Sequence, residues 1–385
     1  MSNHEKSNNP KLARRLGLNR RQFLAATTGL AATTAVTGAL GPMAPAASAA
    51  NGSLVPSGKR GIILYTVRDA IARDPLASDL PSGFKEVLAE LARVGYKQVE
   101  FAGYRQHANA DGGADLNTAA GAQLLRRWLD DNGLEAEGNH GSIPSAIDAG
   151  SLAQFGAACE IANILGLGHI GTGGDPTGSS YKADWAAAAE RWNTLGRRAA
   201  SHGLKLYTHN HDAAYNFLLD SGPLDDAGQP TRSSGTRRLE YFLTQTDPAY
   251  VFLEMDIYWT SAGHLLDIYW AYVAQHRWHT YTDPDGTART DILEPLAVVQ
   301  AQTKRFPLFH AKDGRKNPAV TDGYEMVPFG QGDIDYKSFF AAMGAKGYHN
   351  PMYEQDNAAQ YPTPSASASL DNAATSYQHM ASLRG

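Results

Sequence analysis

The stretch Lys205-Leu-Tyr-Thr-His-Asn-His-Asp212 alternates apolar and polar side chains, as a β-strand with one inward face does. In an extended chain His209 and His211 would face the same side, opposite Leu206 and Thr208. Two imidazoles that point into one space at the end of a strand indicate a candidate metal site.

Three later strands are predicted to end in similar chemistry. They finish in Phe252-Leu-Glu-Met-Asp256, Pro307-Leu-Phe-His-Ala-Lys-Asp313 and Pro351-Met-Tyr-Glu-Gln-Asp356. The chemically active side chains that they offer are, in chain order, Glu254, Asp256, His310, Lys312, Glu354 and Asp356. In a barrel of parallel strands these carboxyl ends meet at one end, where active sites lie. The pattern therefore predicts a metal site assembled from several strands.

Strands and helices alternate along the rest of the chain. Earlier strands are predicted at 61–66, 98–102, 134–139 and 169–172, and helices at 83–94, 118–132, 152–165 and 183–202. A last helix is predicted near 370–383. Eight strand–helix units predict a single (β/α)8 TIM barrel over residues 61–385. A doubly wound sheet is the alternative, but no glycine-rich phosphate motif follows the first strand.

Two polar insertions interrupt this pattern, at 220–237 and at about 271–295. They would form either a rim over the pocket or a contact between subunits, and the second arrangement would make the protein a homo-oligomer. Periodicity does not separate these alternatives.

The N-terminus resembles a twin-arginine (Tat) export signal. Arg14-Arg15 and Asn19-Arg-Arg-Gln-Phe-Leu24 precede a mild apolar run, and Ala47-Ser-Ala49 has the small-x-small form of a cleavage site. We expect residues 1–49 to be removed and 50–60 to be a linker. The alternative, a membrane anchor, is disfavoured because glycine and proline interrupt the run. The mature protein would be extracellular or in the cell wall or periplasm, with no membrane attachment.

Composition excludes some partners and permits others. The chain has 385 residues, 43% of them hydrophobic, and a formal net charge of -5, so a basic face for nucleic acid is not expected. Thirteen histidines permit metal binding. The single cysteine, Cys159, excludes an intrachain disulfide, which suits a protein that folds before export.

One set of side chains is the strongest candidate for holding the ion. The predicted ligands are His209, Asp256, His310 and Glu354. Oxygen ligands suit Mg or Mn, and two imidazoles move the preference toward Mn, Co or Zn. Such a set would leave positions open for two substrate oxygens.

Six motifs, in their order and spacing, resemble the sugar phosphate isomerase/epimerase group of the xylose isomerase-like TIM barrel superfamily. They are Tyr65-Thr-Val-Arg-Asp69, Val99-Glu-Phe-Ala-Gly-Tyr104, His209-Asn-His-Asp212, Asp256-Ile-Tyr-Trp259, His310-Ala-Lys-Asp313 and Tyr353-Glu-Gln-Asp356. The resemblance implies a metal that holds two adjacent oxygens of a ketose or related sugar. A carboxylate then removes the proton beside the carbonyl, through an enediolate.

Two positions depart from the family pattern. His209 stands where the group's ketose 3-epimerases carry a glutamate, and Trp259 stands where many members carry a substrate-binding histidine. Glu354 would still act as base, but its partner in proton transfer would be one of four side chains. These candidates are Glu100, His209, His211 and Lys312.

Candidate substrate contacts lie at other strand ends. They are Tyr65, Arg68, His140 and Trp259. Arg68 would bind substrate oxygens or pair with Asp69, and Trp259 would present an apolar wall to a sugar face. The leading hypothesis is a metal-dependent sugar isomerase or epimerase.

The alternatives differ in chemistry. A 3-keto-glycoside lyase or hydratase would act by β-elimination, because a C3 ketone acidifies the C2 proton and the C1 substituent can leave. That reaction needs one base and suits an exported enzyme that acts on an unphosphorylated keto-sugar. A non-catalytic sugar-binding barrel is another alternative. A metal-dependent endonuclease shares the barrel, but the net charge of -5 disfavours it.

Overall fold

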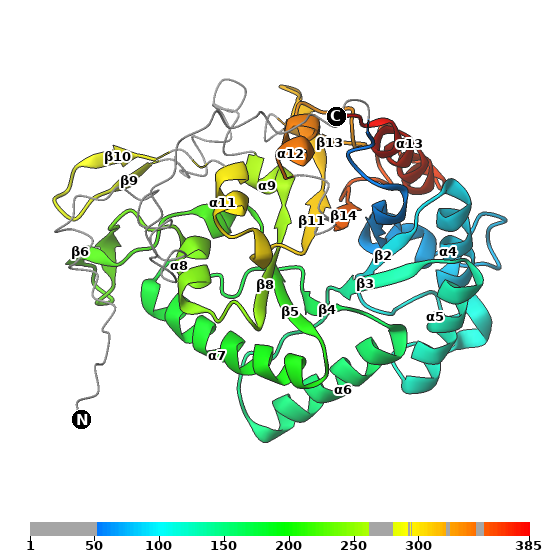
Figure 1. Ribbon diagram of the computed structural model, residues 1–385, viewed down its shortest axis with the longest axis horizontal. Helices are drawn as coiled ribbons and strands as arrows, with labels where there is room; N and C mark the ends of the chain where they lie inside the picture. Colours follow the sequence, from blue (N-terminus) through cyan, green and yellow to red (C-terminus); the bar gives the residue numbers. More distant parts are fainter. Residues whose placement is uncertain (1–51, 262–279, 292, 294, 321–323, 344–349) are drawn as a thin grey trace, which may run out of the picture.

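The computed structural model describes residues 52–261, 280–291, 293, 295–320, 324–343 and 350–385 (Figure 1). The predicted export signal at 1–49 and residues 271–279, 292 and 294 of the second insertion lie outside these ranges. Within the described chain, no helix is both long enough and apolar enough to cross a membrane. Part of the predicted linker is ordered against the C-terminus, because the Leu54 amide donates to the Leu383 carbonyl at 3.1 Å.

Eight parallel strands form one sheet, which confirms the predicted TIM barrel. They are β1 (Gly61–Ile63), β2 (Gln98–Phe101), β3 (Glu135–Asn139), β4 (His169–Thr172), β5 (Lys205–His209), β8 (Val251–Asp256), β11 (Leu308–Ala311) and β14 (Asn350–Tyr353). The order is β3-β2-β1-β14-β11-β8-β5-β4. A parallel bridge between His140 and Gly171 joins the two ends of this order and closes the barrel.

Helices cover the outside of the barrel (Figure 1). The longer ones are α4 (Gly83–Val94), α5 (Ala119–Asp131), α6 (Ala149–Leu165), α7 (Lys182–Ser201), α8 (Arg238–Gln245), α11 (Pro295–Ala301), α12 (Tyr336–Met343) and α13 (Ala368–Ser382). Helix α4 illustrates why the helices could be predicted from the spacing of apolar residues. Its buried side chains Phe84, Val87, Leu88 and Leu91 recur at helical spacing, and Gly95 ends it with a φ of 121°.

Alternation along each strand separates a barrel interior from an outer core. One apolar cluster fills the interior and consists of Ile63, Tyr207, Phe252, Leu308 and Met352. Leu206, Leu253 and Phe309 face the helices instead and belong to the larger outer core. Phe309 packs on Phe339 with ring centroids 5.7 Å apart, as expected of a side chain that points away from the interior. The next inward residue along several strands is polar, so a polar site lies next to this apolar cluster, toward the carboxyl ends of the strands.

The first strand is shorter than expected. It ends at Ile63, and residues Leu64–Val67 form a 3-10 turn instead of the predicted continuation to 66. Two contacts hold this turn: Arg68 Nη1 donates to the Tyr65 carbonyl at 2.8 Å, and the Gln355 amide donates to Thr66 Oγ1 at 3.2 Å. The turn brings Tyr65 to the surface at the end of the barrel.

The insertions contain two hairpins that lie against each other (Figure 1). The first pairs β6 (Ser221–Leu224) with β7 (Pro230–Arg232), and the second pairs β9 (Thr280–Thr282) with β10 (Ala288–Thr290). The Ser233 amide donates to the Thr282 carbonyl at 2.9 Å and joins them. A third hairpin, β12 (Asp313–Lys316) with β13 (Tyr324–Val327), follows β11, and a short helix, α9 (Ile257–Ser261), follows β8.

Candidate metal centre

The four predicted ligands come together at the carboxyl ends of β5, β8, β11 and β14. Each of His209, Asp256, His310 and Glu354 offers one ligand atom, and these atoms all lie within 4.8 Å of one another. All four residues are buried. The distance from His209 Nε2 to Asp256 Oδ2 is 3.7 Å, and that from His310 Nδ1 to Glu354 Oε2 is 2.7 Å. Two imidazoles and two carboxylates suit a divalent ion.

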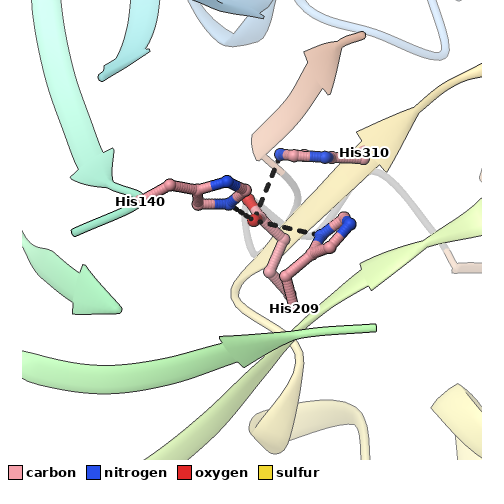
Figure 2. Close-up of side chains that lie close together, drawn as sticks. His140, His209 and His310 are labelled. Carbon is pink, nitrogen blue, oxygen red and sulfur yellow. Dashed lines mark hydrogen bonds and ion pairs between the residues drawn. The ribbon is translucent and has the colours of Figure 1, made fainter. Parts of the chain in front are cut away.

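Glu254 lies directly beneath this set; it was named among the side chains at the strand ends but not among the predicted ligands. Its Oε2 lies 2.6 Å from His140 Nε2, 3.1 Å from His310 Nε2 and 3.5 Å from His209 Nδ1. Figure 2 shows the three imidazole rings of His140, His209 and His310 arranged around one point. Glu254 precedes Asp256 by two residues, so strand alternation alone directs both side chains inward. That signal could have identified it.

Glu100 is a second buried carboxylate beneath the ligand set. Its Oε2 lies 2.9 Å from His310 Nε2, and its Oε1 accepts a hydrogen bond from the Tyr207 hydroxyl. Gly138 leaves room for that pair, because a Cβ there would lie 3.0 Å from Tyr207 Oη and 3.2 Å from Glu100 Oε1. Glu100 and Glu354 therefore contact opposite nitrogens of His310. Glu100 lies deeper in the barrel than Glu354.

Lys312 forms ion pairs with three carboxylates. Its Nζ lies 2.8 Å from Glu354 Oε2, 3.1 Å from Asp256 Oδ2 and 3.1 Å from Asp356 Oδ2. Burial opposes the charge of Lys312, but these carboxylates outweigh it and hold the pKa of Lys312 well above its ordinary value. The ammonium group is thus a fixed positive charge beside two of the four candidate ligands.

The carboxylates of the ligand set differ in pKa. Burial by itself would raise the pKa of Glu354, but Lys312 and His310 lower it well below the usual range. Burial, reinforced by the charge of Glu354, raises the pKa of Asp256 to about 6. Burial and the nearby His310 lower the pKa of His209 well below its usual value, so His209 is neutral and has a lone pair for a metal.

Of the predicted substrate contacts, Tyr65 and Arg68 lie at the surface end of the barrel and His140 lies in the buried group beside Glu254. Tyr65 is 40% exposed, and the Arg68 guanidinium lies 3.9 Å from its ring centroid. Arg68 Nη2 donates to the Asp356 carbonyl at 2.8 Å, which ties this pair to the strand end that carries Glu354. His140 instead turns its Nε2 toward Glu254.

Trp259 lies beside the polar site. The centroid of its ring lies 5.8 Å from the centroid of the His211 ring. Lys312 Nζ lies 5.3 Å from the same Trp259 centroid. Its buried indole N–H has no hydrogen-bond partner among the residues described. An N–H in that state can donate to a ligand oxygen. Burial and the charge of Lys312 lower the pKa of His211, which favours its neutral form.

The chain is similar in sequence and in fold to known proteins. Residues 88–371 match the family model described as xylose isomerase-like TIM barrel. No curated protein matches the chain significantly.

Solved structures with the same fold include a sugar phosphate isomerase/epimerase from Parabacteroides distasonis. It is 21% identical, with 89% of this chain and 98% of that one covered and a TM-score of 0.55. D-psicose 3-epimerase from Clostridium cellulolyticum, solved with D-tagatose, is 13% identical, with coverages of 84% and 99% and a TM-score of 0.51. The probable 3-DHS dehydratase AsbF from Bacillus anthracis is 11% identical, with coverages of 83% and 97% and a TM-score of 0.52.

Proposed function

Because this chain belongs to the xylose isomerase-like TIM barrel family, we propose that it is a divalent-metal-dependent enzyme that removes a proton beside a sugar carbonyl. The observation that carries the proposal is the convergence of His209, Asp256, His310 and Glu354 within 4.8 Å at the active end of the barrel. The ion would be Mn, Mg, Co or Zn. When bound, it would supply a Lewis acid that polarises the carbonyl and stabilises negative charge on the substrate oxygens.

Glu354 is the proposed base. Its carboxylate is ionised, because Lys312 and His310 lower its pKa, and it directly follows β14, at the active end of the barrel. Lys312, with Nζ 2.8 Å from Glu354 Oε2, orients that oxygen, and its raised pKa keeps it a fixed charge rather than a ready proton donor. His211 is the proposed returning group, because its lowered pKa makes its protonated form the readier donor.

The rim would bind the sugar. Tyr65 offers an exposed aromatic face, and Trp259 offers both a ring and a buried N–H donor. One protein of the same fold is named as a D-psicose 3-epimerase, which supports a free ketose or related sugar as substrate. The twin-arginine pattern at residues 1–49 also favours an unphosphorylated sugar, because we propose that the enzyme acts after export.

Isomerase or epimerase chemistry is the first candidate reaction. A β-eliminating 3-keto-glycoside lyase is the second, and the presence of His209 on β5 favours it: the ligand set then holds one glutamate, Glu354, and elimination needs only one base. A dehydratase of the same fold supports this alternative. Both reactions begin with the same proton abstraction, so the ligand set and Glu354 serve either.

The product distinguishes the two reactions. Mature protein purified without chelator would be analysed for bound metal and then incubated with ketoses and 3-keto-glucosides, with products identified by mass spectrometry. An isomeric product of unchanged mass supports isomerase or epimerase chemistry. Release of an aglycone moves the assignment to a lyase. Ligand-induced thermal stabilisation with no product under any metal would instead indicate a sugar-binding barrel.

A further inference from the structure

The carboxylate of Glu254 lies beside a ring nitrogen of both histidines of the proposed metal site. We infer that Glu254 is a positioning residue: its buried carboxylate holds His209 and His310 in the tautomers that bind the ion. This inference rests on the proposed function, because it concerns the same metal. Oε2 of Glu254 is approached by His310 Nε2 at 3.1 Å, by His209 Nδ1 at 3.5 Å and by His140 Nε2 at 2.6 Å.

Each of the two histidines uses its ring nitrogens on different partners. His209 presents Nε2 toward Asp256 at 3.7 Å and Nδ1 toward Glu254. His310 presents Nδ1 toward Glu354 at 2.7 Å and Nε2 toward Glu254 and Glu100. One nitrogen of each ring therefore faces the proposed ligand carboxylates, and the other faces the deeper carboxylates.

The proton count of imidazole decides what Glu254 does. A neutral imidazole carries one N–H, so a ring that binds a metal through one nitrogen carries its proton on the other. A buried N–H needs an acceptor, and the Glu254 carboxylate lies beside this nitrogen in both rings. His140, His209, Glu254 and His310 form a second group that could hold an ion, but ions in both groups at once would require the shared rings to lose both protons. With the ion in the set that includes Asp256 and Glu354, the lower group serves as a hydrogen-bond anchor.

The geometry assigns opposite tautomers to the two ligands. His209 would carry its proton on Nδ1, and His310 would carry its proton on Nε2. Glu254 is fully buried, so its charge needs compensation, and His140 Nε2 lies 2.6 Å from the same carboxylate. Loss of the carboxylate would leave His209 Nδ1 without its acceptor, whereas His310 Nε2 would keep Glu100 Oε2 at 2.9 Å.

Metal affinity tests this role directly. We would titrate metal-free wild type, Glu254→Gln and Glu137→Gln with Co²⁺ and follow the visible absorption of the bound ion. Glu137 is a matched control, since it is a partly buried barrel carboxylate that accepts hydrogen bonds from Gln98 at 2.5 Å and Asn350 at 3.2 Å rather than from a histidine side chain. We expect Glu254→Gln to weaken Co²⁺ binding about 10- to 100-fold and to alter its spectrum. Glu137→Gln should match wild type.

The outcomes separate this inference from the proposed function. Wild-type affinity and spectrum in Glu254→Gln would overturn the positioning role and leave the metal enzyme intact. Failure of wild type to bind Co²⁺ would overturn both.

A measurement on wild type keeps the inference testable if Glu254→Gln does not fold. Nitrogen NMR of ¹⁵N-histidine in the Zn²⁺-loaded protein reports which ring nitrogen carries the proton, with signals assigned by replacing each histidine in turn. We expect the proton of His209 on Nδ1 and that of His310 on Nε2. The opposite position in either ring would contradict the role of Glu254.

Discussion

The ammonium nitrogen of Lys312 lies 2.8 Å from Oε2 of Glu354 and 3.1 Å from Oδ2 of Asp256, two of the four proposed metal ligands. The side chain of Lys312 is 1% exposed, so this charge is buried with its partners. Removal of one partner from a buried ion pair leaves the other charges poorly compensated.

Lys312→Met should therefore destabilise the metal-free protein by about 3 kcal/mol. A divalent ion should restore much of that loss, because it supplies positive charge to the same carboxylates. Denaturant unfolding with and without Mn²⁺ measures both effects. The exposed Lys337→Met is the control and should change stability little. Equal stability of metal-free Lys312→Met and wild type would contradict this account of the charges.

Gly171 closes the barrel where no side chain fits. A Cβ at this position would lie 2.2 Å from the Tyr207 backbone oxygen and 2.6 Å from its ring. Gly171→Ala should lower the free energy of unfolding by about 3 kcal/mol, because β4 and β5 would have to separate. In Gly178→Ala, the added methyl group meets no atom of the described chain within 4 Å, and stability should remain near that of wild type.

Tyr207 anchors Glu100 in the barrel interior. Its hydroxyl donates to the buried Glu100 carboxylate, and both side chains are fully buried. Tyr207→Phe removes the donor but keeps the ring, so the cost should be about 1–3 kcal/mol, that of a buried acceptor left without its partner. Chemical denaturation at pH 7 would measure it. No loss of stability in Tyr207→Phe would mean that the hydroxyl does not support Glu100.

His169 should make the fold sensitive to acid. Burial lowers the pKa of His169 to about 4, and its Nδ1 lies 3.0 Å from the Glu137 carbonyl oxygen. As the pH falls below the ordinary histidine pKa of about 6.5, the unfolded chain takes up a proton that the folded protein does not accept until about pH 4. Unfolding is favoured throughout that interval, by up to about 3 kcal/mol in total.

His169→Gln should remove that part of the pH dependence. The free energy of unfolding, measured from pH 7 to pH 4, would then fall less steeply in the variant than in wild type. Parallel curves for the two proteins would show that His169 is not the source of the acid sensitivity.

Much of the fold and the proposed ligand set could be predicted because both depend on local alternation. His209, Asp256, His310 and Glu354 each end a short apolar run, and parallel strands bring such ends together. Period-two alternation also implied that Glu254 faces inward with Asp256, although it was not included among the predicted site residues.

Other features depend on contacts between distant parts of the chain. The bond between Tyr207 and Glu100 joins residues 107 positions apart, and that between His140 and Glu254 joins residues 114 apart. Alternation gives the side on which each of these residues lies, but not the partner that it finds there. The 3-10 turn after Ile63 also depends on a distant partner, because the Gln355 amide donates to Thr66 Oγ1.

The central claim is that a metal held by this site lets Glu354 remove a proton beside a sugar carbonyl. Incorporation of deuterium from heavy water into a ketose or 3-keto-glucoside, followed by NMR while chelator-stripped protein is titrated with divalent metal, tests it most directly. We predict little incorporation by the metal-free protein, incorporation that rises with metal until the site is filled, and a loss of about 10³-fold or more in Glu354→Gln. Incorporation at the full rate without metal, or in Glu354→Gln, would contradict the claim.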